Sequence, residues 1–141
     1  MGEQLEVTVV STDDKVQCSA TARSNPAVTF DYRAPLGNGQ GYTGLEGLLM
    51  SLSACSGTTL VYLLRKMGKS VSGFQVRAKG IRQDKPPFSL ETIFLEFDIS
   101  SGDVDDAGMK KAMQMMDAAC PVWVLMKNNV GIKTDYKIHV A

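Results

Sequence analysis

Apolar and polar residues alternate in three short stretches near the start of the chain, which is the pattern of half-buried β-strands. The stretches cover residues 5–10, 16–22 and 28–32. The turn-forming sequences STDDK and SNP separate them. Together the three stretches predict an antiparallel meander.

A different spacing follows, because from about Thr43 to Gly68 the apolar residues recur at helical intervals. Thr43 fits an N-cap, and Glu46 three residues later completes a capping box. Gly68 is typical of a residue just beyond a helix end. The segment is nearly long enough to cross a membrane, but Glu46 and many Ser and Thr residues argue against lipid. We therefore expect a buried central helix about 40 Å long, a length that suits a helix shared across a dimer.

Two longer alternating stretches, 73–83 and 90–100, flank DKPPFS and predict a hairpin. Asp103 is then expected to cap a helix that begins at Val104, since acidic residues favour the first helical turn.

Pro121 should interrupt that helix before a short helical piece over 122–129. A last strand is expected after Gly131. The predicted order is βββ-α-ββ-α-α-β, an α+β fold in which residues 1–141 form a single domain.

Composition excludes several classes of function. The 15 basic and 15 acidic residues balance, so no charged surface for nucleic acid or an anionic membrane is expected. The start MGEQLEVTVV lacks the basic residues and apolar run of a signal peptide, which favours a cytoplasmic location. Three widely spaced cysteines do not resemble a secreted disulfide framework. With His139 as the only histidine and no CxxC motif, no metal site is expected.

Two cysteines stand in settings that suit chemistry. Small residues surround Cys55 in SLSACSGTTL and would let a ligand approach its thiol, although a buried packing role fits equally. Cys120 in AACPVW precedes a proline at a helix start, where unpaired N–H groups favour a reactive thiolate; its alternative is a helix-break residue without chemistry. Cys18, on the apolar side of a strand, is most simply a core residue.

Glu46 has a second interpretation, as a carboxylate that holds an arginine in place. Helix geometry puts Glu46 and Cys55 on opposite sides of the helix, about 13 Å apart along its axis. A site that uses both would need a bent helix or two chains. The simplest interpretation of Arg23 and Arg33 is that they are solvated strand residues. The alternative is functional, because a guanidinium beside a thiol would stabilise its thiolate and steer a polar substrate.

The sequence GLEGLLMSLSACSG, followed later by AACPVW, resembles the two cysteine motifs of the OsmC/Ohr family of thiol-dependent peroxidases, and is closest in character to its OsmC-like branch. The order of strands and helices is similar over essentially the whole chain. The resemblance implies an intertwined homodimer, in which antiparallel strands wrap around long central helices and the active sites lie at the subunit interface.

The same resemblance implies roles for individual residues. Cys55 would be the peroxidatic cysteine and Cys120 the resolving one, Glu46 would match the acidic position at the helix start, and Arg33, with Arg23 as the alternative, would be the partner arginine. The reaction needs no metal or flavin cofactor. A thiolate attacks the O–O bond of an organic hydroperoxide, the sulfenic acid condenses with the second thiol, and an external dithiol, typically lipoyl-based in this family, restores both thiols.

Three functions therefore stay open at the level of sequence. The leading prediction is a cytoplasmic, dimeric reductase of organic hydroperoxides. The alternatives are a dimer that binds an apolar small molecule without catalysis and a redox sensor that uses the same thiols. The two-cysteine mechanism requires the Cα atoms of Cys55 and Cys120 to approach within about 7 Å.

Overall fold

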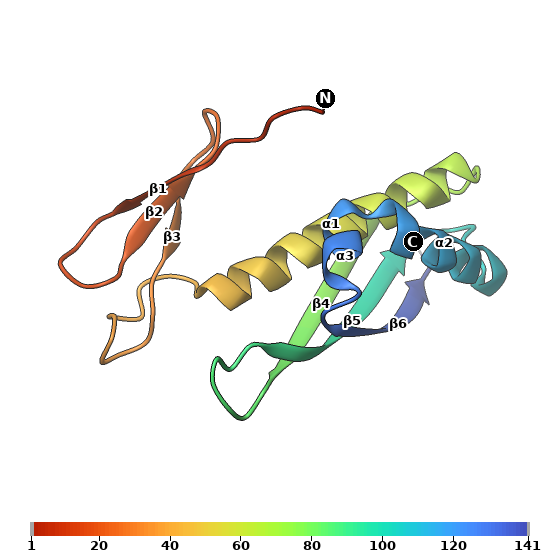
Figure 1. Cartoon of the computed structure of the whole chain (residues 1–141). Coiled ribbons are helices and arrows are strands. Elements are labelled where there is room, and N and C mark those ends of the chain that lie inside the picture. Colours follow the sequence, from red (N-terminus) through yellow and green to blue (C-terminus); the bar gives the residue numbers. More distant parts are fainter. Residues whose placement is uncertain (1, 141) are drawn as a thin grey trace. The chain divides into compact units, whose positions relative to one another are not determined.

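The first three strands form the predicted antiparallel meander in a computed structural model that describes residues 2–140. Strands β1 (Thr8–Ser11), β2 (Cys18–Thr21) and β3 (Val28–Phe30) lie side by side in chain order (Figure 1). Each strand is shorter than the alternating stretch that predicted it. The meander is therefore confirmed, with reduced strand lengths.

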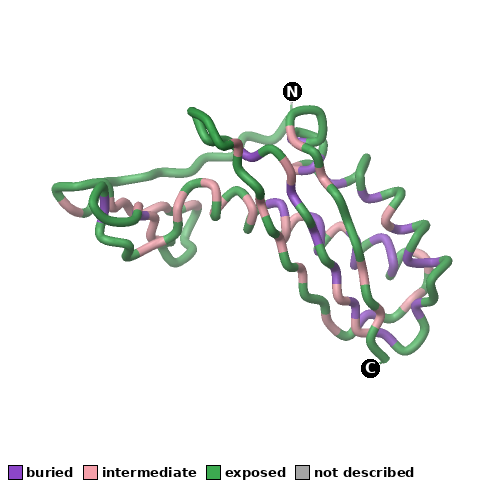
Figure 2. The backbone as a smooth tube through the Cα atoms, turned by 90° about the horizontal axis from the view of Figure 1, so that it is seen from below, coloured by how far each residue is buried: buried purple, intermediate pink, exposed green. Residues whose placement is uncertain are grey.

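Contacts within the chain divide it into two compact units, one up to Gly47 and one from Leu48 on. In the first unit, the only buried residues among those described are Asp31 and Gly37. Figure 2 accordingly shows this part almost without buried residues. A three-stranded sheet with so little buried apolar surface has no core of its own. The expected single domain stays a prediction.

Helix α1 (Gly44–Lys66) begins with the predicted capping box. The Thr43 N–H donates to Glu46 Oε1 at 2.8 Å, and the Glu46 N–H donates to Thr43 Oγ1 at 3.3 Å. Beyond its last residue, Gly68 adopts a left-handed φ of 83°, a conformation that glycine takes without strain. The predicted bounds of this helix are confirmed to within two residues.

The second sheet contains β4 (Gly73–Arg82), β5 (Leu90–Ser100) and β6 (Gly131–His139), in that order. The predicted hairpin is confirmed, since β4 and β5 pair antiparallel. Strand β6 pairs with β5 in parallel, which corrects the expectation of antiparallel strands throughout. The two helices between β5 and β6 form a crossover that returns the chain to the end of the sheet where β5 begins, as a parallel pair requires.

Two helices make up this crossover, α2 (Asp106–Ala119) and α3 (Pro121–Met126). Asp105 caps α2 by accepting the Gly108 N–H, so the expected cap at Asp103 is wrong. The Asp103 carboxylate instead accepts hydrogen bonds from the backbone N–H and the hydroxyl of Ser70, at 2.9 and 3.0 Å. Asp103 therefore joins the segment that follows α1 to the segment that follows β5.

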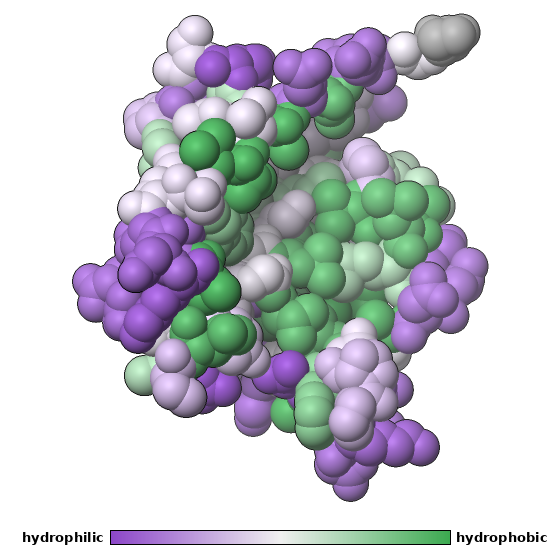
Figure 3. Space-filling view, turned by 60° about the vertical axis from the view of Figure 1, so that its left-hand side comes forward, coloured by the Kyte–Doolittle hydropathy of each residue, from purple (hydrophilic) through white to green (hydrophobic). Residues whose placement is uncertain are grey.

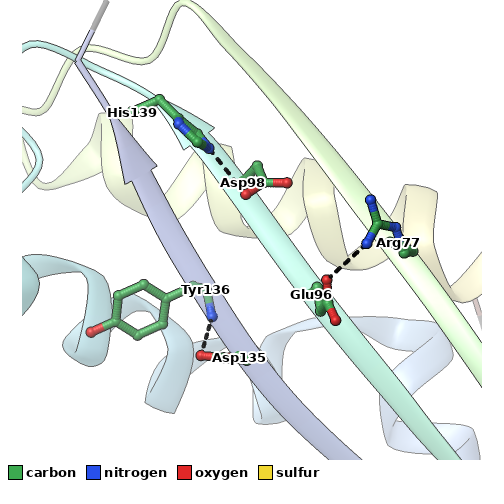
Figure 4. Close-up of polar contacts among 6 residues, drawn as sticks. All are labelled: Arg77, Glu96, Asp98, Asp135, Tyr136 and His139. Carbon is green, nitrogen blue, oxygen red and sulfur yellow. Dashed lines mark hydrogen bonds and ion pairs between the residues drawn. The ribbon is translucent and has the colours of Figure 1, made fainter.

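The core of the second unit lies between the β4-β5-β6 sheet and the three helices, which cover one face of it (Figures 1 and 4). Alternate residues of β5 point into this core and are at most 1 % exposed: Ile93, Leu95, Phe97 and Ile99. Helix α1 approaches the sheet closely at Gly57, where an added Cβ would lie 2.4 Å from the Phe74 ring. By length and hydropathy alone α1 could cross a membrane, but buried core helices pass the same test.

The opposite face of this sheet is exposed and carries pairs of polar side chains (Figure 4). Arg77 and Glu96 form an ion pair at 3.3 Å, and His139 contacts Asp98 at 3.1 Å. Exposed pairs of this kind contribute about 1 kcal/mol or less each. The face is therefore a solvated surface, and His139 belongs to it.

Candidate active site

The second unit brings together the two cysteines that the sequence singled out. Cys55 lies midway along α1 and is half-buried, while Cys120 lies between α2 and α3 and is fully buried. The thiol of Cys55 interacts with the Cys120 thiol and with the Val122 N–H. Both cysteines are free thiols. Two side chains far apart in sequence thus form one dithiol.

The local backbone explains how Cys120 reaches this position. Its N–H donates to the Met116 carbonyl at 2.9 Å, and its own carbonyl accepts from the Val124 N–H at 3.0 Å. Cys120 therefore ends α2 and caps α3 at once. Its extended conformation (φ −81°, ψ 115°) is the one that a following proline favours, and Pro121 occupies the first helical position as predicted.

The electrostatic surroundings of Cys55 favour its neutral form in this chain. Burial is the largest cause that raises its pKa, and the hydrogen bond and charge of Cys120 raise it further. The Val122 N–H and the Thr59 hydroxyl act in the opposite direction and lower it. The net pKa of Cys55 is raised, so a reactive thiolate would need an additional positive charge.

The start of α3 has a different role from the one that the sequence predicted. We expected its unpaired N–H groups to favour a thiolate at Cys120. The cap residue Cys120 makes no side-chain capping hydrogen bond, and the Val122 N–H interacts with Cys55 instead. The Val122 N–H therefore acts on the thiol of Cys55, which is distant in sequence, and not on that of Cys120, which is nearly adjacent in sequence.

Sequence reasoning missed Ser56. Its hydroxyl lies 3.8 Å from Cys120 Sγ, and both residues are completely buried. Ser56 lies four residues after Leu52 and four before Leu60, both of which are core residues. A polar side chain in that buried stripe was the feature that could have revealed it, because a buried hydroxyl needs a hydrogen-bond partner.

The first unit holds the charged residues proposed for the site. Besides capping α1, Glu46 has a lowered pKa, mainly from the Thr43 N–H and hydroxyl and to a lesser extent from the positive charge of Arg33. Arg33 and Arg23 are both exposed, and Arg23 sits in a turn with φ 57°. Of the two arginines, Arg33 is the one whose charge acts on Glu46.

Asp31 organises the loop that carries Arg33, and sequence reasoning missed it as well. Its carboxylate accepts backbone N–H groups from Tyr32, Asn38 and Gln40 at 2.8, 3.2 and 3.0 Å. These hydrogen bonds, led by the one from Gln40, lower the pKa of Asp31. A buried aspartate that binds the loop backbone in this way fixes the loop's course.

The other candidate features add no further group to the site. Cys18 is half-buried in β2, where it pairs with Ser11 and Phe30. Among residues 2–140, no cluster of three or more His, Cys, Asp or Glu side chains could hold a metal ion.

Known proteins of similar sequence and structure give the family. Residues 37–135 match the model of the OsmC-like protein family. Protein YhfA of Escherichia coli K12 is 26 % identical over 98 residues, which cover 69 % of this chain and 73 % of YhfA.

Solved structures agree with this likeness. An OsmC-like protein from Mycoplasma pneumoniae superposes with a TM-score of 0.85 at 20 % identity, covering 99 % of both chains. The organic hydroperoxide resistance protein OhrB of Bacillus subtilis superposes with a TM-score of 0.66 at 14 % identity, over 96 % of this chain and 98 % of OhrB. At these identities the structures support the fold, and the family match covers most of the sequence: the chain belongs to the OsmC-like protein family.

Proposed function

We propose that this protein is a thiol-dependent peroxidase that reduces organic hydroperoxides, with Cys55 as the attacking thiol and Cys120 as the resolving one. The observation that carries the proposal is the interaction between the two thiols, one half-buried and one fully buried, together with the 3.8 Å approach of Ser56, the residue next to Cys55, to Cys120 Sγ. The family match and the likeness to an organic hydroperoxide resistance protein support the same class of chemistry.

The proposed cycle needs only these thiols and an external reductant. The Cys55 thiolate attacks one oxygen of the O–O bond, an alcohol leaves, and Cys55 becomes a sulfenic acid. The sulfur of Cys120 then attacks the Cys55 sulfur, and water is released as the disulfide forms. A dithiol, which we expect to be lipoyl-based, returns both cysteines to the reduced state. No metal or flavin takes part in these steps.

Activation of Cys55 is the step that the second unit does not explain by itself, because burial raises the pKa of this thiol. Arg33 is our candidate for the missing positive charge, with Glu46 as the carboxylate that orients it. Glu46 and Cys55 lie on opposite sides of α1 by helix geometry. We therefore assign Arg33 and Glu46 to the site of a partner chain.

A homodimer is the assembly that this arrangement requires. The exposed apolar side chains of β1 support it, since this strand is exposed along its whole length and Val9 and Val10 are 59 % and 57 % exposed. Figure 3 shows many apolar residues gathered on the surface. Exposed apolar side chains of the second unit include Tyr62 and Leu125, at 61 % and 76 %.

A cytoplasmic location completes the proposal, because a reducing compartment keeps such a dithiol available.

The test compares peroxides and variants. Reduced protein is mixed with cumene hydroperoxide or with hydrogen peroxide, and loss of thiols is followed in the parent and in Cys55→Ser, Cys120→Ser and Cys18→Ser variants. We expect rapid loss of two thiols per chain with the organic peroxide, abolished by Cys55→Ser and unaffected by Cys18→Ser. Thiols that react only after denaturant is added would refute the peroxidase and favour a binding protein. Oxidation without sustained turnover would favour a redox sensor.

A further inference from the structure

We propose that Ser56 is a positioning residue for Cys120, and that its hydroxyl donates a hydrogen bond to the Cys120 sulfur when that sulfur leaves the disulfide as a thiolate. The inference rests on the proposed disulfide cycle. It adds which sulfur the reductant attacks, Cys55, and which sulfur leaves, Cys120. It assigns a role to a buried hydroxyl that neither helix packing nor capping explains.

The geometry points to Ser56 because two consecutive residues of α1 contact the same sulfur. Cys55 interacts with the Cys120 thiol from one side, and Ser56 Oγ lies 3.8 Å from Cys120 Sγ. Among the described residues, Cys120 Sγ is the one hydrogen-bond partner of the Ser56 hydroxyl. A hydroxyl is a stronger donor than a thiol, and a Cys120 sulfur in a disulfide or as a thiolate has no proton to donate, so in those states Ser56 is the donor of this pair.

Burial determines which sulfur an external thiol can reach. Cys120 is 0 % exposed, whereas Cys55 is partly open to solvent. Attack by a reductant thiolate must therefore occur at Cys55 Sγ. A new S–S bond forms between the reductant and Cys55, the Cys55–Cys120 bond breaks, and the electron pair of that bond goes to Cys120. The second thiolate of the reductant then displaces Cys55, so that the dithiol is oxidised and both cysteines are reduced.

This direction of attack leaves a negative charge on a sulfur without water around it. A buried charge is costly unless a donor satisfies it, and hydrogen bonds to charged groups are stronger than neutral ones. The Ser56 hydroxyl is the donor already in place at that sulfur. Its loss should slow the departure of Cys120 and leave the approach of the reductant to Cys55 unchanged.

The experiment forms the disulfide with diamide in a Cys18→Ser protein, so that it does not depend on any reaction with peroxide. Reduction by dihydrolipoic acid is then timed in the parent and in Ser56→Ala, Ser56→Thr and Ser51→Ala variants. Ser51 is exposed on the same helix and provides the matched control. Alanine removes only the oxygen of Ser56 and is the better helix former, which favours a folded variant.

We expect Ser56→Ala to slow reduction at least about tenfold, the loss of one hydrogen bond to a charged leaving group. Ser51→Ala should stay within about twofold of the parent, and Ser56→Thr, which keeps the hydroxyl, should restore most of the rate. Equal rates for Ser56→Ala and Ser51→Ala would overturn the proposal.

A second measurement needs no substitution at Ser56. Glutathione replaces the dithiol, the reaction is stopped with an alkylating agent, and the mixed disulfide is located by peptide mass analysis. We expect glutathione on Cys55 and the alkyl group on Cys120; glutathione on Cys120 would contradict the inference. A protein that forms this disulfide with diamide but never reacts with hydroperoxides would refute the peroxidase function while leaving the role of Ser56 testable by the same rates.

Discussion

The thiol of Cys55 on α1 contacts the thiol of Cys120 at the junction of α2 and α3, and this contact raises the pKa of Cys55 beyond the effect of burial. A resolving cysteine at this position therefore makes it harder for the attacking cysteine to form a thiolate. The Val122 N–H offsets part of it.

Replacing Cys120 by alanine should lower the pKa of Cys55, because it removes both the hydrogen bond and the charge of Cys120. The measurement is the rate of iodoacetamide alkylation of Cys55 against pH, in a Cys18→Ser background. We expect the midpoint of the profile to move to lower pH and the rate at neutral pH to rise. A midpoint that is unchanged or higher would show that Cys120 does not act on Cys55 in this way.

The two roles of Glu46 can be separated with a pair of substitutions. Glu46→Gln keeps an oxygen that can accept the Thr43 N–H but removes the negative charge on which the positive charge of Arg33 acts. We expect it to lower peroxidase activity strongly with little change in melting temperature. Thr43→Ala should do the reverse and cost about 1 kcal/mol of stability, the usual loss of an N-cap, while activity is retained. Equal activity in both variants would restrict Glu46 to capping.

Asp31 should make the first unit sensitive to acid. Its pKa is lowered in the folded protein, so its ionised form stabilises the fold at pH values above the unfolded pKa of about 3.9. That contribution is lost as the pH falls through the lower folded pKa. Asp31→Asn should therefore reduce the melting temperature at neutral pH, and the difference from the parent should shrink toward low pH. The exposed Asp14→Asn is the control, and a difference that does not change with pH would contradict this account.

A dimer predicts that stability depends on concentration. Partner chains that bind only the folded state raise the melting temperature as the protein concentration increases. Sedimentation should give twice the chain mass of 15.3 kDa, and a Val9→Glu, Val10→Glu double variant should weaken association by placing charge on the exposed first strand. A monomer whose melting temperature is independent of concentration would exclude a site completed by a second chain.

The sequence predicts those parts of the fold that local chemistry determines. The capping box at Thr43 and Glu46, the glycine after α1 and the proline that opens α3 all occur where their local rules put them. The alternating residues of β5 identify its core face for the same reason.

Features that depend on distant contacts were not predictable. In the sequence, Asp103 and Asp105 are equally good candidates for the helix cap. In the structure, Asp103 accepts a hydrogen bond from Ser70, and Asp105 is the residue that caps the helix. The parallel pairing of β6 depends on the path of the crossover helices. Likewise, the interaction of the Val122 N–H with Cys55 requires α1 and α3 to lie together. Neither of the two cysteine motifs carries information about this packing.

The most direct test of the proposed mechanism is to locate the disulfide formed by one equivalent of cumene hydroperoxide. Reduced protein is oxidised, remaining thiols are alkylated, and peptides are analysed by mass. The proposed mechanism predicts a Cys55–Cys120 disulfide with Cys18 alkylated, in line with the contact between the first two thiols. Alkylation of all three cysteines, or a disulfide that involves Cys18, would contradict it.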